Sequence, residues 1–179
     1  KAASDHFVRA YHRTYGMDIT ITNCSNNYGP HQHYEKFIPK IIESVLLNKE
    51  IPIYGKGENV RDWLFVKDHA IAIDNVFRLG ISGETYNVGG NKELSNIELV
   101  YLICAIMKSQ GYHKSPEDLI TFIEDRAGHD LRYAINSDKI TTYLEWEPSP
   151  ELFEERLLET IQWYVQIYNK NKQTVTYEE

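Results

Sequence analysis

The chain has 179 residues, of which 42% are hydrophobic, and a formal net charge of −7 with a pI near 5.5. This length and composition predict one globular domain with a sizeable core. No segment concentrates lysine or arginine, so a nucleic-acid partner is not expected. No apolar run approaches the ~18 residues of a membrane span, and the opening KAASDHF lacks the pattern of a signal peptide, so we expect a cytoplasmic protein with no membrane partner.

No metal centre is predicted from the cysteines and histidines. Cys24 and Cys104 are isolated and lack the spacing of metal ligands, and two buried thiols are expected rather than a disulfide. His31 and His33 flank one residue, but no third ligand of suitable spacing follows. A solvated histidine pair is therefore favoured over a zinc site.

The first predicted element is a helix over residues 1–15, in which Phe7, Tyr11 and Tyr15 recur four apart and Gly16 can end the helix. A protein rarely begins in mid-helix, so we expect this sequence to be part of a longer one. A buried strand over 19–22 follows.

A polar loop comes next, with the sequence NCSNNYGPHQHYEKF at residues 23–37. It is either a long surface turn or the rim of a ligand site. The patterns beyond it predict helices over 35–47, 68–80, 96–108, 137–144 and 150–168, and strands over 51–54, 63–66, 85–88 and 120–123. Ser95 and Glu98 stand at the two positions of a capping box.

The last helix carries an apolar stripe as far as Tyr168, and residues 169–179 lack one and are predicted to form a frayed tail. Strands alternate with helices almost throughout, which predicts an α/β fold. Such folds bind ligands in the loops at the carboxyl ends of their strands, where the polar loop is expected to lie.

Two arginines are candidates for an anion site. Arg61 heads the segment RDWLF, and Arg126 lies in DRAGHD just after another predicted strand. A guanidinium group at a strand end suits bidentate capture of phosphate oxygens, and a diphosphate would use both arginines. The alternative for Arg61 is a surface pair with Asp62 or Asp68. No G-x-G-x-x-G and no G-x-x-x-x-G-K-[ST] occurs, so nothing in this chain cradles a dinucleotide or triphosphate in the usual way.

Five segments, taken together, resemble one family. They read KAASDHFVRAYHRTYG, TNCSNNYGPHQHYEKFIP, PIYGKGENVRDWLFVKDHA, ETYNVGG and DRAGHDLRYAI. In this order they resemble the carboxyl-terminal half of the dTDP-glucose 4,6-dehydratases, a family of extended short-chain dehydrogenase/reductases. The resemblance covers residues 1–168. NNYGP and YNVGG recur in related nucleotide-sugar epimerases, whereas EKFIP, PIYG, RDWL and GHDLRYA are more specific. Ala127 is a departure, since the bacterial pattern usually has proline there.

The resemblance implies the end of a Rossmann-type parallel sheet interleaved with a smaller mixed α/β substrate-binding region. Lys1 resembles the catalytic lysine of a Y-x-x-x-K pair, whose spacing puts both side chains on one helix face. Its tyrosine, the glycine-rich NAD loop and the acid/base residues would precede the sequence given. The implied reaction is the NAD-dependent dehydration of dTDP-glucose to the 4-keto-6-deoxy sugar, with hydride taken from C4 and returned to C6.

The resemblance also assigns residues to a site. Lys1, Cys24 and Asn27 would contact NAD. The implied substrate contacts are Asn26, Lys36, Phe37, Pro52, Ile53, Tyr54, Arg61, Asn96, Asp125, Arg126, Ala127, Gly128, His129 and Tyr133. Some of these have a structural alternative, since Phe37 and Ile53 could belong to the core.

Two other functions stay open at this point. One is another extended family member, such as a UDP-hexose epimerase or a nucleotide-sugar decarboxylase, and the other is a non-catalytic nucleotide-sugar-binding domain. Because the chain as given lacks the tyrosine and the acid/base pair, we expect it to be inactive by itself. A homodimer is expected from the resemblance, with the helix face of Phe7 and Tyr11 as a candidate contact, although a core packed within the chain would look the same.

Overall fold

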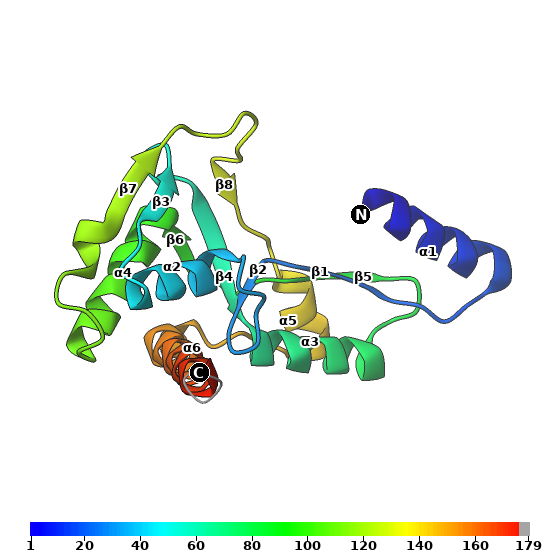
Figure 1. Ribbon diagram of the computed structural model, residues 1–179. Coiled ribbons are helices and arrows are strands. Elements are labelled where there is room, and N and C mark those ends of the chain that lie inside the picture. Colours follow the sequence, from blue (N-terminus) through cyan, green and yellow to red (C-terminus); the bar gives the residue numbers. More distant parts are fainter. Residues whose placement is uncertain (176–179) are drawn as a thin grey trace.

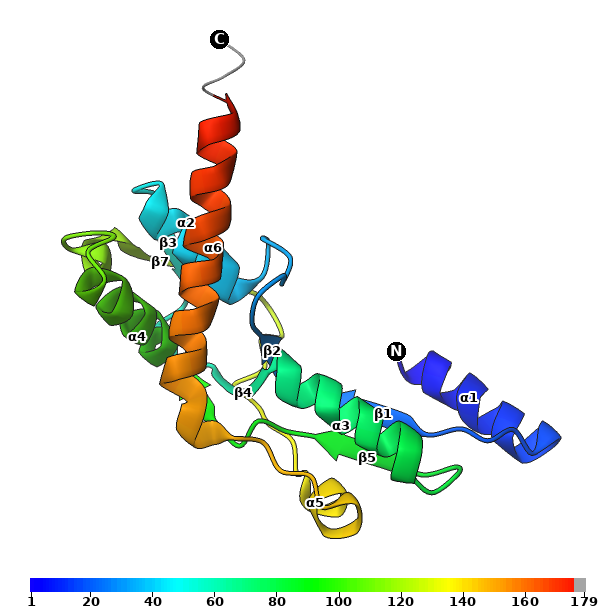
Figure 2. The same cartoon turned by 90° about the horizontal axis from the view of Figure 1, so that it is seen from below.

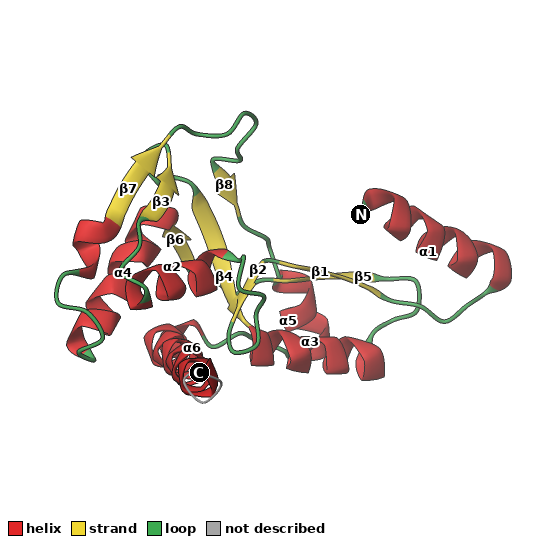
Figure 3. Ribbon diagram, in the orientation of Figure 1, coloured by secondary structure: helices red, strands yellow, loops and turns green. Residues whose placement is uncertain are grey.

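The computed structural model describes the backbone of residues 1–175 and the side-chain surroundings of residues 1–170. The chain has the predicted α/β composition (Figures 1 and 3). Its helices are α1 (Ala2–Tyr15), α2 (Phe37–Leu46), α3 (Val66–Leu79), α4 (Asn96–Ser109), α5 (Asp138–Leu144) and α6 (Phe153–Val175), with 3-10 turns at Pro116–Leu119 and Pro150–Leu152. Its strands are β1 (Ile21–Cys24), β2 (Asn26–Tyr28), β3 (Ile51–Tyr54), β4 (Val60–Phe65), β5 (Thr85–Val88), β6 (Glu93–Ser95), β7 (Ile120–Ile123) and β8 (Arg132–Tyr133).

Strand pairing is mostly parallel, and β4 makes the most connections. β1 pairs with β5 and β3 pairs with β7, both in parallel. β4 pairs in parallel with β2 and β8 and antiparallel with β6. Parallel pairing brings the carboxyl ends of strands to a common edge, which is where α/β folds place their ligand sites.

The apolar residues form two cores that meet at β4. The larger core lies among β2, β3, β4, α2, α4 and α6, and includes Trp63 and Phe65. The smaller core lies among β4, β5, α3 and α5, and includes Leu64. Successive side chains of a strand face opposite ways, so β4 supplies both cores from its two faces. Figure 2 shows the same division, with α6 along α2 and α4, and with α3 and α5 beside β5.

A buried carboxylate ties the loop after β5 to β4. Asp62 is 2% exposed, and its two oxygens accept hydrogen bonds from the backbone nitrogens of Gly90 at 2.8 Å and Lys92 at 3.0 Å. Gly90 lies so close to β4 that a Cβ atom there would be 2.0 Å from the carbonyl oxygen of Trp63. Glycine at position 90 is therefore required for the close approach of the two backbones.

Helix α1 lies at the edge of the described chain in both views (Figures 1 and 2), and Arg9 Nη2 donates to Thr85 Oγ1 on β5 at 2.6 Å. The helix ends at Gly16 in the left-handed conformation, as predicted, and buries none of its residues. Phe7, Tyr11 and Tyr15 are 69%, 52% and 70% exposed. The alternative that this face packs into a core of the same chain is therefore wrong for the described residues.

Several predicted elements are confirmed and others need correction. The strands at 51–54, 85–88 and 120–123 have the predicted bounds, and Ser95 and Glu98 form the capping box. The strand predicted at 19–22 lies at 21–24. β2 lies within the segment predicted as a polar loop, because pairing with β4 overrides the low strand propensity of asparagine.

Short strands and one helix end were also missed. β6 and β8 have only three and two residues, too few for a period-two pattern. α6 continues to Val175, past the end predicted at Tyr168, because its lysine and glutamine residues favour a helix without an apolar stripe. Residues 176–179 of the predicted tail lie outside the described residues. None of the described helices is both long and apolar enough to span a bilayer.

Replacing Asp62 by asparagine should lower the free energy of unfolding by about 2 kcal/mol, because an amide NH₂ would face one of the two buried N–H donors. Urea unfolding of the two proteins measures the difference. Asp74→Asn is the matched control, since Asp74 pairs with Arg78 on the exposed surface of α3 and its loss should cost well under ~1 kcal/mol. Equal losses in both variants would contradict the role given to Asp62.

Candidate functional site

A cavity of about 300 Å³ opens where β2, β3 and β4 meet the loop between β7 and β8. Its lining residues are Asn26, Glu35, Phe37, Ile53, Tyr54, Arg61, Trp63, Asn96, Arg126 and His129. Eight of these ten belong to the residues implied by the family resemblance. Glu35 and Trp63 were missed, although Glu35 directly precedes Lys36 and Trp63 lies two residues after Arg61. The fold therefore gathers residues that are up to about a hundred positions apart in the chain.

Arg61 brings a buried positive charge to this cavity. It is 8% exposed, and its Nη1 donates to the carbonyl oxygens of Val60 at 2.7 Å and Asp130 at 3.0 Å. No carboxylate among the described residues lies within ion-pairing distance of it. A buried cation without a carboxylate partner favours the binding of an anion.

The predicted alternative, an ion pair of Arg61 with Asp62 or Asp68, is wrong. Asp62 accepts from two backbone N–H groups. Asp68 instead receives the guanidinium of Arg156 and the backbone nitrogen of Ser149. Both carboxylates are therefore satisfied elsewhere.

The loop between β7 and β8, which Figure 1 shows, contains Arg126 and His129, and both residues line the cavity. Asp125 Oδ1 accepts hydrogen bonds from His129 Nδ1 at 2.7 Å and from the backbone nitrogen of Arg126 at 2.9 Å. The hydrogen bond from His129 is the main cause of a pKa for the Asp125 carboxyl below its usual value. The His129 side chain is 6% exposed and meets Tyr54 edge-on, at 6.1 Å between ring centroids.

Six of the predicted substrate residues do not line the cavity. Asp125, Ala127 and Gly128 lie in the β7–β8 loop, where Gly128 has a φ of +70° that favours glycine. Lys36 is exposed just before α2, Pro52 is exposed on β3, and Tyr133 is exposed on β8. Tyr133 nevertheless lies beside Arg61 in the register of β4 and β8.

Three of the lining residues, Ile53, Trp63 and Phe37, also belong to the core or its border. Ile53 is 1% exposed within the larger core, and Phe37 packs against the same core. Phe37 stacks on Trp63 with 6.3 Å between ring centroids. These side chains form an apolar wall facing the two arginines, so the cavity is suited to a ligand with one flat apolar part and one anionic part.

The residues predicted to contact the cofactor lie outside this cavity. Lys1 is exposed at the start of α1, and Cys24 is half-buried at the carboxyl end of β1. Burial raises the pKa of the Cys24 thiol, so the thiol stays protonated near neutral pH. The side chain of Asn27 is already engaged, because its Nδ2 donates to the carbonyl oxygen of Ser25 at 3.0 Å and its Oδ1 lies 2.7 Å from His69 Nδ1.

Ser25 is a further polar residue at the carboxyl end of β1 that the sequence did not single out. It is 4% exposed, and its hydroxyl has no hydrogen-bond partner among the described residues. A buried hydroxyl without a partner is costly unless some group satisfies it. Among the described residues, the hydroxyl of Ser25 beside Cys24 is therefore available to a polar atom of a ligand.

The rim of the cavity, residues 29–36, is anchored on α6. The Gln32 side chain donates to the carbonyl oxygen of Asn27 at 2.8 Å, and the Tyr164 hydroxyl donates to the carbonyl oxygen of Gln32 at 2.5 Å. His31 and Trp163 are in ring contact with 4.5 Å between centroids. Burial raises the pKa of Tyr164 to about 12, so its hydroxyl remains a donor well above neutral pH.

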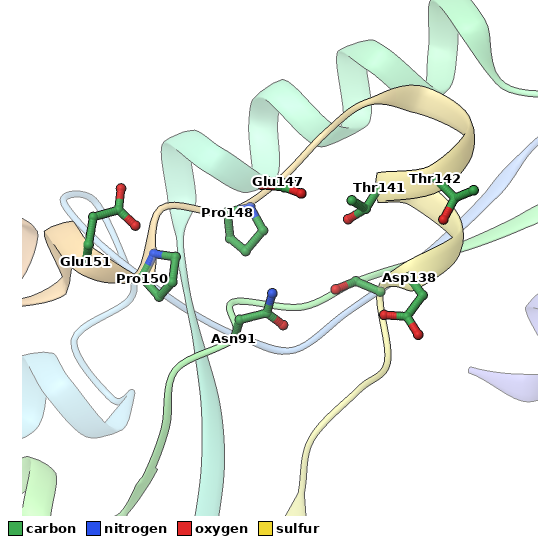
Figure 4. A pocket seen from close by; sticks show the side chains of 9 residues that line it. Asn91, Asp138, Thr141, Thr142, Glu147, Pro148, Pro150 and Glu151 are labelled. Atoms are coloured by element: carbon green, nitrogen blue, oxygen red, sulfur yellow. The ribbon is translucent and has the colours of Figure 1, made fainter.

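A larger cavity of about 460 Å³ lies beside α5 and has a different chemistry (Figure 4). The residues that line it are Asn91, Ser137, Asp138, Thr141, Thr142, Glu147, Pro148, Pro150 and Glu151. These residues include three carboxylates and no lysine or arginine, so the surface repels a diphosphate. Among the described residues, no group of three or more potential ligands is arranged to hold a metal ion.

The fold and the first cavity together define a class of protein. It is the class of α/β proteins that have a cavity suited to an anion at the carboxyl ends of parallel strands. The family model for GDP-mannose 4,6 dehydratase matches residues 1–160, and the chain belongs to this family.

The curated relatives that the chain matches include dTDP-glucose 4,6-dehydratases. The chain is 51% identical over 170 residues to a dTDP-glucose 4,6-dehydratase of Neisseria meningitidis, covering 92% of this chain and 48% of the relative. It is 48% identical over 181 residues to a dTDP-glucose 4,6-dehydratase of Shigella flexneri, covering 99% of this chain and 50% of the relative. The chain spans about half the length of the curated relatives it matches, and resembles their carboxyl-terminal half, as predicted.

Solved structures give the same result. A dTDP-glucose 4,6-dehydratase of Bacillus anthracis, in complex with NAD, matches with a TM-score of 0.83 and 44% identity over 93% of this chain and 50% of that one. The enzyme of Streptomyces venezuelae, with NAD and TYD bound, matches with a TM-score of 0.84 and 42% identity over 93% of this chain and 49% of that one. The predicted fold, the carboxyl-terminal part of an extended short-chain dehydrogenase/reductase, is confirmed.

Replacing Tyr164 by phenylalanine should loosen the rim, since the carbonyl oxygen of Gln32 loses its donor on α6. We expect a loss of about 1 kcal/mol in the free energy of unfolding and faster amide hydrogen exchange across residues 29–36. Tyr143→Phe is the control, because Tyr143 is 65% exposed. Unchanged exchange in Tyr164→Phe would contradict an anchored rim.

Proposed function

We propose that this chain forms the nucleotide-sugar-binding half of a dTDP-glucose 4,6-dehydratase, a hydro-lyase that uses NAD. The observation that carries the proposal is the convergence of Arg61 and Arg126 on one cavity with an aromatic wall. The two guanidinium groups suit a diphosphate, and the wall suits the base or sugar attached to it. The sequence identity of 51% and 48% to two dTDP-glucose 4,6-dehydratases supports the same choice.

Each lining residue has a role in this proposal. Arg61 and Arg126 bind the two phosphates from opposite sides, and Asn26 hydrogen-bonds the diphosphate or the sugar. Tyr54 and Phe37 flank the thymidine. Asn96 is free for a ligand contact because Ser95, one residue earlier, caps α4.

The NAD site would be shared with residues beyond this cavity. Cys24 and the partnerless hydroxyl of Ser25 lie at the carboxyl end of β1, and they fit a small polar part of the cofactor. Asn27 fits less well, since its side chain is held by Ser25 and His69. Bound NAD would supply the acceptor for the C4 hydride that is returned to C6. Lys1 would lower the pKa of a neighbouring tyrosine, as a fixed ammonium does.

The fold alone does not choose between a dehydratase and an epimerase. A UDP-glucose 4-epimerase of Thermotoga maritima, solved with UDP-glucose, matches with a TM-score of 0.82 but with only 26% identity, over 94% of this chain and 52% of that one. Its TM-score is close to that of the dehydratases, whereas its identity is much lower. The nucleotide base that the protein binds and the product that it forms are therefore needed to distinguish a dehydratase from an epimerase.

The proposal includes a homodimer. The exposed Phe7, Tyr11 and Tyr15 give α1 an apolar face that the rest of the described chain does not cover. Exposed apolar faces of this kind favour protein contacts. The cytoplasmic location expected from the sequence stays a prediction.

Replacing Arg126 by alanine should weaken the binding of thymidine diphosphate by about 30-fold, the equivalent of ~2 kcal/mol for a charged phosphate contact. Arg61→Ala should cost at least as much. Arg78→Ala is the control, because Arg78 pairs with Asp74 on the surface of α3. Calorimetric titration with the diphosphates of thymidine, uridine and guanosine measures affinity and base preference. If Arg61→Ala bound as well as the parent, the diphosphate role would fail.

A protein that joins this chain to an amino-terminal half like that of its relatives should form a 4-keto sugar nucleotide that absorbs in alkali when it is incubated with dTDP-glucose and NAD, whereas the 179-residue chain by itself should form none. Formation of C4 epimers without this product would favour the epimerase. Tight binding with no product from the protein that includes the amino-terminal half would favour a non-catalytic nucleotide-sugar-binding domain.

A further inference from the structure

The pair formed by Asp125 and His129 has a geometry that plain anion binding by two arginines does not require. An ionised carboxylate can only accept hydrogen bonds, so the 2.7 Å contact requires a proton on His129 Nδ1. The low pKa of the Asp125 carboxyl keeps that acceptor ionised. The edge-on contact with Tyr54 holds the ring from the other side. The orientation and the tautomer of His129 are therefore set by the protein.

The second ring nitrogen of His129 is left for the cavity. His129 lines the cavity, and its Nε2 has no hydrogen-bond partner among the described residues. In a neutral ring with the proton on Nδ1, Nε2 is an acceptor and repels a phosphate oxygen. In an imidazolium ring both nitrogens donate, so Nε2 can bind the same oxygen.

Some charged groups around His129 favour a positive charge on its ring, and others disfavour it. Arg126 in the same loop and Arg61 on β4 face the cavity and disfavour an additional positive charge. Asp125 in the loop and Glu35, just before α2, favour it. Tyr54 on β3 contributes a neutral ring. A bound diphosphate adds two negative charges beside the ring, so ligand binding shifts this balance towards the imidazolium.

We propose that Asp125 is a positioning residue, which holds His129 so that its Nε2–H donates to a phosphate oxygen of the bound nucleoside diphosphate sugar, and that binding takes up one proton at His129. The proton comes from solvent, an N–H bond forms at Nε2, and no bond of the ligand breaks. This inference rests on the proposed function. It changes the role of Asp125 from a direct substrate contact, as the resemblance implies, to one exerted through His129.

The test is calorimetric titration of the protein with dTDP-glucose between pH 6 and 8, in pairs of buffers that differ in ionisation enthalpy. A phosphate monoester titrates near pH 6, whereas the doubly esterified diphosphate of a sugar nucleotide has no such group. Any proton taken up therefore belongs to the protein. We expect the logarithm of Kd to rise with pH with a slope approaching about one, and the buffer pairs to report uptake of up to about one proton.

Three variants test whether Asp125 acts by positioning His129 or only through its negative charge. His129→Gln should bind more weakly below pH 7 and should lose the proton uptake. Asp125→Asn should keep a pH dependence with its midpoint at lower pH, because the imidazolium loses its carboxylate. Glu124→Gln removes the same charge one residue away from Asp125, on an exposed side chain, and should behave as the parent.

The outcomes distinguish this inference from the proposed function. Affinity for dTDP-glucose that is independent of pH, or an unchanged proton uptake in His129→Gln, would overturn the inference alone. A shift in Glu124→Gln equal to that in Asp125→Asn would overturn the positioning role. Failure to bind dTDP-glucose at any pH would overturn the proposed function, and the inference with it.

Discussion

The opposite directions of neighbouring side chains on β4 are the constraint on which the rest of the structure depends. On one face Asp62 binds two backbone N–H groups of the loop after β5, and on the other Arg61 and Trp63 line the cavity. The same strand supplies Phe65 to the larger core and Leu64 to the smaller one. A shift of one residue in β4 would exchange these two sets of side chains.

The electrostatics of the cavity follow from this arrangement. Arg61 is buried where carbonyl oxygens, rather than carboxylates, meet its guanidinium group. Such a site gives up part of the stabilisation that an ion pair would provide, and regains it when an anion binds. Asp125, the carboxylate next to Arg126, is instead hydrogen-bonded to His129. Asp125 is therefore engaged by His129 and leaves Arg126 available to an anionic ligand.

Residues that look equivalent in the sequence can have different roles once tertiary contacts form. The asparagines after β1 stood out in the sequence, yet Asn26 lines the cavity whereas Asn27 is turned towards Ser25 and His69. Adjacent residues of β2 face opposite ways, so only one of the pair can reach the ligand. Glu35 and Trp63 escaped notice because a carboxylate near a phosphate site and a tryptophan in an apolar strand carry no signal of their own.

The sequence by itself determined the α/β class, most helices and strands, the capping box of α4 and the family, because these depend on local periodicity, caps and contiguous motifs. It also indicated which two arginines to consider. Only the tertiary structure decided that Arg61 and Arg126 share a cavity, that no carboxylate of the described residues pairs with Arg61, and that Asp125 is hydrogen-bonded to His129. Those facts depend on strand register and on a loop that brings together residues far apart in the chain, and neither leaves a periodic trace in the sequence.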